Sequence, residues 1–165
     1  TNQGFGHIQK GHGTAFADFD EDGDQDIYMV VGGFYEGDVY QNILLDNQGM
    51  LENHYIQVRL KGSRSNTLGI GARLEAVLKA DNEGHRRIFR TVGSGGSFGA
   101  SPFTQHIGLG DIEMVDTLYV HWPNSTSPQI LTQLVADRLY VIEEDSLSSE
   151  AVSSARFAEN PRNWK

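Results

Sequence analysis

Residues 54–60 read HYIQVRL, and this stretch decides the fold class of the 165-residue chain. From Ile56 to Leu60 every second residue is apolar, which places the apolar side chains on one face of a strand because successive side chains point to opposite sides. The same period of two returns in residues 73–78 and 118–122. Short alternating runs separated by Gly, Asn, Ser and Pro predict an all-β fold, an antiparallel β-sandwich or barrel.

The composition limits the possible partners and chemistry. A formal net charge of −9 disfavours nucleic acid and anionic membrane surfaces as partners, and it suits cation binding. The absence of cysteine excludes disulfide scaffolds, thiol catalysis and zinc–thiolate sites. No apolar run approaches the length of a membrane span, so we expect no membrane insertion.

Upstream of the alternating strands, residues 18–26 read DFDEDGDQD. Like carboxylates this close repel one another by about 1 kcal/mol per pair even in water, and a hard divalent cation would offset that repulsion. Calcium takes about six to eight oxygen ligands in a flexible geometry, and Gly23 stands at the sixth loop position, where the chain must turn sharply. The candidate calcium ligands are Asp18, Asp20, Asp22, Asp24 (through its backbone carbonyl) and Asp26.

This loop is not an EF-hand. Its twelfth position is Met29 where the EF-hand has Glu, and Ile27–Val31 reads as a buried strand where the EF-hand has a helix. The pattern therefore predicts a DxDxDG calcium loop between two strands, with Asp26 as the closing carboxylate. A solvated acidic turn without a metal is the alternative.

Residues 13–28 resemble the FG-GAP/VCBS repeat, a calcium-loop unit of extracellular β-propellers. The resemblance implies that Asp18, Asp20, Asp22 and Asp26 bind Ca²⁺, together with a backbone carbonyl at the place of Asp24. Only one such loop is present, whereas a propeller needs several blades. This copy is therefore either the last blade of a longer protein or an orphan repeat docked on the following domain.

The segment from about residue 53 to 143 resembles the ASPIC/UnbV domain of cartilage acidic protein-like proteins. Four pieces carry the resemblance: residues 65–74 (SNTLGIGARL), 92–101 (VGSGGSFGAS), 106–110 (HIGLG) and 120–123 (VHWP). In that family the domain follows FG-GAP/VCBS repeats, which is the order seen here. The family has no established catalytic residues, so the resemblance implies none in this chain.

The sequence divides into three predicted segments. Residues 1–52 form the calcium-loop repeat, residues 53–144 the ASPIC/UnbV-like β domain and residues 145–165 a C-terminal tail. The tail is rich in Ser and Ala, and Ser148 or Ser149 would cap a short helix over Ala151 and the residues after it. A frayed tail is the alternative.

Three other features have plain structural interpretations. The glycines of Gly93–Gly99 fit tight turns and close strand approach, because the loop lacks the lysine of a phosphate-binding loop. His106, before a Gly-Leu-Gly turn, is expected to be a structurally satisfied histidine of the β core. Trp122 ends a strand before Pro123, and we expect its side chain in the core.

The sequence therefore predicts a non-enzymatic, calcium-stabilised module for protein or glycan recognition, secreted, periplasmic or at a cell surface. Arg86, Arg87 and Arg90 form its basic cluster, which is either a solvated sheet face or a contact for an acidic partner or a sulfated or uronic glycan. Two alternatives stay open: an accessory protein or enzyme of secondary metabolism, and a structural cap of a β-propeller.

Overall fold

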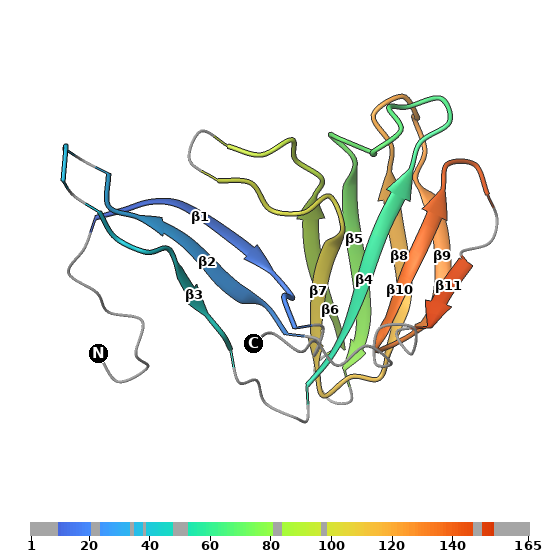
Figure 1. Ribbon diagram of the computed structural model, residues 1–165. Coiled ribbons are helices and arrows are strands. Elements are labelled where there is room, and N and C mark those ends of the chain that lie inside the picture. The colour runs from blue at the N-terminus through green and yellow to red at the C-terminus, as the bar shows by residue number, and fades with distance from the viewer. Residues whose placement is uncertain are drawn as a thin grey trace. The chain divides into compact units, whose positions relative to one another are not determined.

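The computed structural model describes residues 10–20, 24–33, 35–37, 39–47, 53–80, 84–96, 99–146 and 150–153. Within these ranges the chain forms eleven strands and no helix (Figure 1). It divides into two compact units, which we call the first unit (residues 1–49 and 94–102) and the second unit (residues 50–93 and 103–165). The all-β fold class expected from the sequence is confirmed.

The first unit contains a three-stranded antiparallel sheet. Its strands lie in the order β1 (Gly11–Ala17), β2 (Asp26–Val31) and β3 (Ile43–Leu45). The ladder between β1 and β2 closes at the pair Ala17–Asp26, so the acidic residues 18–25 form the connection between these two strands. The strand expected at Ile27–Val31 is confirmed, but it is not buried throughout, because Tyr28 and Val30 are exposed.

Gly99 belongs to the first unit and lies against β1. A Cβ atom built on Gly99 would lie 2.1 Å from the carbonyl oxygen of Thr14, which only glycine avoids. Close approach to a strand therefore explains this glycine of the Gly/Ser-rich segment, as the sequence suggested.

The second unit contains two four-stranded sheets. One sheet has the order β11-β10-β4-β7 and the other β6-β5-β8-β9. The strands of the first are β4 (His54–Lys61), β7 (Gln105–Gly110), β10 (Arg138–Glu143) and β11 (Glu150–Ser153). The strands of the second are β5 (Arg73–Ala80), β6 (Gly84–Thr91), β8 (Met114–His121) and β9 (Gln129–Val135).

The two sheets of the second unit lie face to face (Figure 1). One hydrophobic core fills the space between them. Ile56, Ile107 and Ile142 enter it from one sheet, and Leu74 and Leu118 from the other; all five are fully buried. This arrangement is a β-sandwich. It departs from the expected antiparallel pairing at one place, because β4 and β10 run parallel.

The expected C-terminal helix is wrong for residues 150–153. These residues form β11, which pairs antiparallel with β10 and places Val152 opposite Leu139. The edge of β10 offers backbone donors and acceptors, and pairing with them overrides the helix propensity of Glu150 and Ala151, which alone is worth only tenths of a kcal/mol per residue. Residues 154–165, which include the rest of the expected helix, lie outside the described residues. In the part of the chain that is described, no helix is long and apolar enough to span a bilayer.

Candidate functional site

The acidic loop lies between β1 and β2 of the first unit. The structure describes four of the five expected calcium ligands, and Asp22 lies outside the described residues together with Gly23. Asp18 follows β1, and Asp26 is the first residue of β2. The pairing of Ala17 with Asp26 therefore holds the two ends of the loop next to each other.

Asp26 is the most deeply buried of the described aspartates. Its Oδ2 accepts a hydrogen bond from the backbone N–H of Phe19 at 2.8 Å, and its Oδ1 accepts one from the N–H of Asn47 at 2.9 Å. The carboxylate thus joins the acidic loop to the residues that follow β3. Each carboxylate oxygen has two lone pairs, so these two bonds leave room for a cation.

Asp18 and Asp24 also turn side-chain oxygens away from solvent. Oδ1 of Asp18 and both carboxylate oxygens of Asp24 are buried, whereas Asp20 is exposed. The sequence assigned the backbone carbonyl of Asp24 to the metal, and the buried carboxylate adds a second kind of oxygen donor there. Buried negative charge is costly without positive charge nearby, and oxygen donors of this type suit a hard cation such as calcium.

The described residues do not by themselves complete a metal cage. Among them, no three Asp, Glu or His side chains meet in a group that would hold an ion. Asp18, Asp24 and Asp26 stand in one loop, and Asp22, the fifth expected ligand, belongs to the stretch that is not described.

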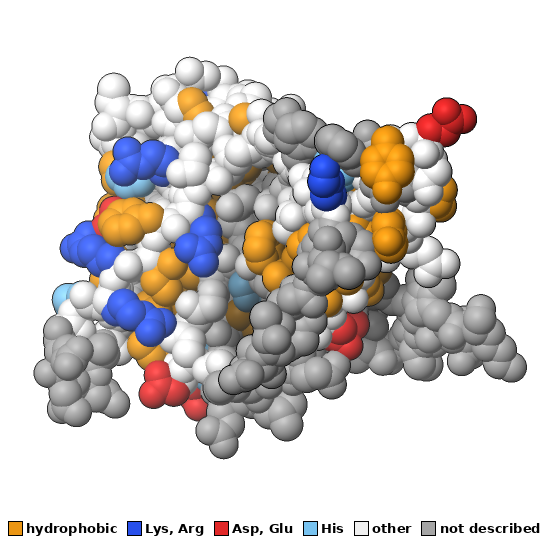
Figure 2. Space-filling model, turned by 90° about the vertical axis from the view of Figure 1, so that its left-hand side faces the viewer, with side chains coloured by type: hydrophobic (Ala, Val, Ile, Leu, Met, Phe, Trp, Pro, Cys, Tyr) orange, Lys and Arg blue, Asp and Glu red, His pale blue; other side chains and the backbone are white. Residues whose placement is uncertain are grey.

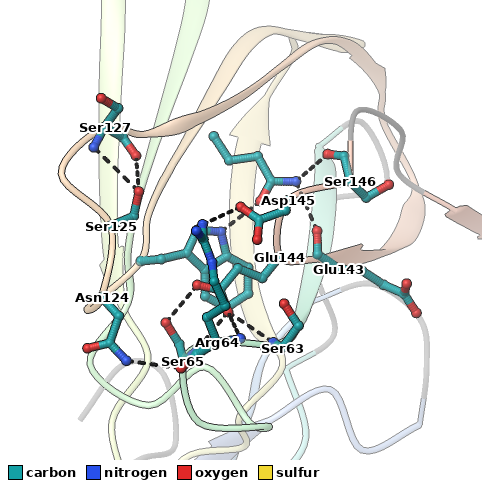
Figure 3. Close-up of polar contacts among 12 residues, drawn as sticks. Ser63, Arg64, Ser65, Asn124, Ser125, Ser127, Glu143, Glu144, Asp145 and Ser146 are labelled. Atoms are coloured by element: carbon teal, nitrogen blue, oxygen red, sulfur yellow. Dashed lines mark hydrogen bonds and ion pairs between the residues drawn. The ribbon is translucent and has the colours of Figure 1, made fainter.

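The second unit holds a carboxylate that the sequence reasoning missed. Glu144 follows β10 and is 5% exposed. Its Oε2 accepts hydrogen bonds from the backbone N–H groups of Ser63 (2.9 Å), Arg64 (2.8 Å) and Ser65 (2.7 Å). Its Oε1 accepts a bond from the Ser65 hydroxyl at 2.8 Å (Figure 3). Three successive N–H groups pointing at one anion form a nest.

The nest determines the charge state of Glu144. Burial alone would raise the pKa of this carboxyl, but the backbone and hydroxyl bonds of Ser65, with those of Arg64 and Ser63, outweigh burial and lower the pKa from 4.5 to about 2. Glu144 is therefore ionised at neutral pH. It fixes the loop that precedes the Gly-Ile-Gly-Ala motif to the end of β10.

Trp122 belongs to the same end of the sandwich. Its ring is buried, as the sequence predicted, and Nε1 donates to Oε1 of Gln129 at 2.7 Å. The amide of Gln129 in turn donates to the carbonyl oxygens of Glu143 (3.0 Å) and Ser146 (2.6 Å). The Trp-Pro motif is thus connected through Gln129 to the chain on both sides of Glu144.

A sequence signal for Glu144 exists. Tyr140 and Ile142 are both buried and point into the core, so alternation places residue 144 on the same side. A glutamate at a core-facing position requires hydrogen-bond donors, and the Ser63–Ser65 loop supplies them.

His106 differs from its expected environment. The residues after it continue β7 as a strand, where a turn was expected. The ring stacks on Tyr55, with centroids 5.1 Å apart and planes 12° apart. Burial, and then the charge of Arg90, lower the pKa of His106 to about 4, so the ring is neutral. Its Nδ1 is buried and has no hydrogen-bond partner among the described residues, so stacking holds the ring in place.

The basic cluster of β6 separates into two kinds of side chain. Arg86 donates to the carbonyl oxygen of Leu109 and Arg90 to that of His106, both on β7, so these two arginines bridge the edges of the two sheets. Arg87 points to the other side of β6 and pairs with Glu75 on β5.

The fold and these contacts define an all-β protein with a β-sandwich unit. At one end of the sandwich, a buried, ionised glutamate and a buried tryptophan form hydrogen bonds that connect neighbouring segments. A protein-family model described as ASPIC and UnbV matches residues 62–149, more than half of the chain, and the chain belongs to this family. The matched region contains the Ser63–Ser65 nest, Trp122 and Glu144. A comparison with curated proteins gave no match.

Proposed function

We propose that this chain is a non-enzymatic, calcium-stabilised extracellular module for protein or glycan recognition. The observation that carries the calcium assignment is the burial of carboxylate oxygens from Asp18, Asp24 and Asp26 in one loop that resembles an FG-GAP/VCBS repeat. Extracellular calcium is near millimolar, which suffices for sites with a Kd of about 10⁻⁴ M. A secreted, periplasmic or cell-surface location is part of the proposal.

The proposed role of the ion is structural. Asp18, Asp20, Asp22, Asp24 and Asp26 would hold it, and its two positive charges would offset the repulsion among them. Because the chain has no cysteine, no disulfide holds the strands of the first unit together. At a hundredfold excess over Kd, binding to the folded state alone adds about 2.7 kcal/mol to stability.

A thermal melt tests the calcium assignment. We expect the melting temperature to rise by about 5–10 °C between chelator and calcium at a hundredfold excess over Kd, with a smaller rise in Mg²⁺. Asp18→Asn should lose most of the calcium-dependent rise, because Asp18 is expected to bind the ion through its carboxylate. Glu36→Gln, an exposed acid of the same unit outside the loop, should keep it. An equal rise in Asp18→Asn and wild type, or no rise in wild type, would exclude the site.

A specific observation favours a second function, packing of the first unit on further β units as a propeller cap. Tyr28 and Leu44 are exposed neighbours on one face of its sheet, and Phe16 is exposed on the other. Neighbouring exposed apolar side chains of this kind would be covered by a further β unit packed on the sheet. Tyr28→Ser with Leu44→Ser should reduce binding of a hydrophobic dye, whereas Leu68→Ser, at an equally exposed position in the second unit, should not. Unchanged dye binding by the double variant would remove this candidate.

A further inference from the structure

The positive charge of this acidic chain is concentrated on two neighbouring strands. β5 and β6 together carry five of the 13 Lys and Arg residues, while the chain as a whole has a net charge of −9. The two strands contain a single acidic residue, Glu75. Figure 2 shows Lys and Arg side chains gathered on the left-hand part of the view, with hydrophobic side chains between them.

Strand alternation assigns part of this charge to the outward side of the sheet. Leu74, Ala76 and Leu78 are buried, so the alternate residues of β5, including Arg73 and Lys79, point away from the core. The paired residues of β6 that share this outward side are His85, Arg87, Phe89 and Thr91.

Three apolar residues, interrupted by Glu75, form an apolar row across the same outward side. The register aligns Phe89, Glu75, Tyr119 and Ile130 across β6, β5, β8 and β9. Phe89 and Ile130 are each 54% exposed, and Tyr119 is half-buried. Phe89 and Tyr119 lie two strand spacings apart, or about 10 Å, which is close to the length of a disaccharide.

Glu75, which stands in this row, contacts two basic side chains next to it. Its Oε1 pairs with Arg87, and its Oε2 lies 3.7 Å from Nε2 of His121 on β8. The Glu75 side chain is only 16% exposed, whereas that of Arg87 is 55% exposed. Glu75 therefore holds the Arg87 guanidinium next to the apolar row, and the N–H donors on the rest of its fork can face a ligand anion.

We propose that this outward side, which we call the basic face (Arg73, Lys79, Arg87, Phe89, Tyr119 and His121), binds an acidic polysaccharide. The proposal deepens the recognition function above and rests on it. Sugar rings present flat C–H faces that pack on Phe89 and Tyr119. Carboxylate or sulfate groups on the sugars pair with Arg73 and Arg87, which form charge-assisted, bidentate hydrogen bonds with such anions.

The edge of β6, next to Phe89 and Arg87, is not free for an acidic peptide to add as a strand. A peptide would bind a sheet most simply by adding a strand at an open edge. Arg86 and Arg90 bridge that edge to the carbonyl groups of β7 and so obstruct strand addition. On the face itself Arg87, Phe89 and Ile130 are exposed, which suits a ligand that lies flat across the strands.

Titration calorimetry on the full chain tests the proposal, with heparin as sulfated probe, polygalacturonate as carboxylated probe, dextran as neutral control and polyglutamate as acidic peptide. We expect heparin or polygalacturonate to bind, dextran not to bind, and the affinity to fall as salt screens the charges. Binding should persist in chelator, because the basic face lies entirely in the second unit. If calcium does not raise the melting temperature but the polysaccharide still binds, only the calcium assignment is overturned.

Variants locate the binding face. Arg73→Gln with Arg87→Gln should weaken binding about tenfold, and Phe89→Ala, which leaves the Arg87–Glu75 pair intact, roughly fivefold. Arg138→Gln removes the same charge from an exposed position on the other sheet and should change affinity less than twofold. Equal binding by Phe89→Ala and wild type, no binding to either acidic polysaccharide, or tighter binding of polyglutamate would each overturn the proposal.

Discussion

Replacing Glu144 by Gln tests how much the ionised carboxylate of Glu144 stabilises the second unit. The substitution keeps the shape of the side chain but removes the charge that accepts four hydrogen bonds from Ser63, Arg64 and Ser65. The pKa decrease from 4.5 to about 2 corresponds to about 3 kcal/mol of preference for the ionised form. Solvent screening near the surface reduces that figure, so we expect Glu144→Gln to lower the free energy of unfolding at pH 7 by about 2 kcal/mol.

The pH dependence separates lost charge from lost packing. Because folding depresses the pKa of Glu144, its contribution is fully present above pH 4.5 and is lost as the pH falls toward about 2. Urea unfolding at pH 7 and pH 3 gives the difference in free energy of unfolding between wild type and Glu144→Gln. We expect this difference to be less than half as large at pH 3 as at pH 7. Glu143→Gln, an exposed neighbour paired with Lys61, should cost less than about 1 kcal/mol at either pH. A difference of the same size at both pH values would refute the role of the ionised carboxylate.

Three further substitutions probe the two units. Asp26→Ala should destabilise the first unit by about 1–3 kcal/mol in chelator as well as in calcium, because it leaves the N–H groups of Phe19 and Asn47 without their acceptor; a loss seen only in calcium would contradict this. Trp122→Phe should cost about 1–3 kcal/mol in urea unfolding, because it leaves Oε1 of Gln129 without its donor; an unchanged free energy of unfolding would show that this hydrogen bond contributes nothing. Gly69→Ala should cost about 1–3 kcal/mol, since its φ is +68° and a Cβ would lie 2.6 Å from that of Leu60; a neutral effect would show that the loop relaxes.

Regular alternation made part of the fold predictable. β4 and β8 have a buried face and a more polar face. Their alternating sequence therefore predicts both that they are strands and which side chains point into the core. β7 was misread because its two glycines suggested a turn, although Gly108 simply lies opposite Tyr55 within the ladder. β11 was misread because its pairing with β10 depends on a distant part of the chain and not on local propensity.

The candidate sites also differ in whether they depend on a local sequence pattern or on pairing between distant parts of the chain. The aspartate loop is local, and its spacing alone identified it as a place of concentrated negative charge. The Glu144 nest joins residues about 80 positions apart in the chain, and the basic face requires the register of four strands. Neither arrangement has a contiguous motif, so each becomes visible only when the pairing of the strands is known.

The buried carboxylates of the two units differ in what could stabilise them. Glu144 is a single charge, and the dipoles of three N–H groups and one hydroxyl are sufficient to keep it ionised. Five aspartates share the loop at residues 18–26, and each added charge increases the repulsion on the others. Neutral dipoles such as the N–H groups that bind Asp26 do not reduce that net charge, whereas a divalent cation does. Chelator should therefore destabilise the first unit without changing the pH dependence that Glu144 gives to the second.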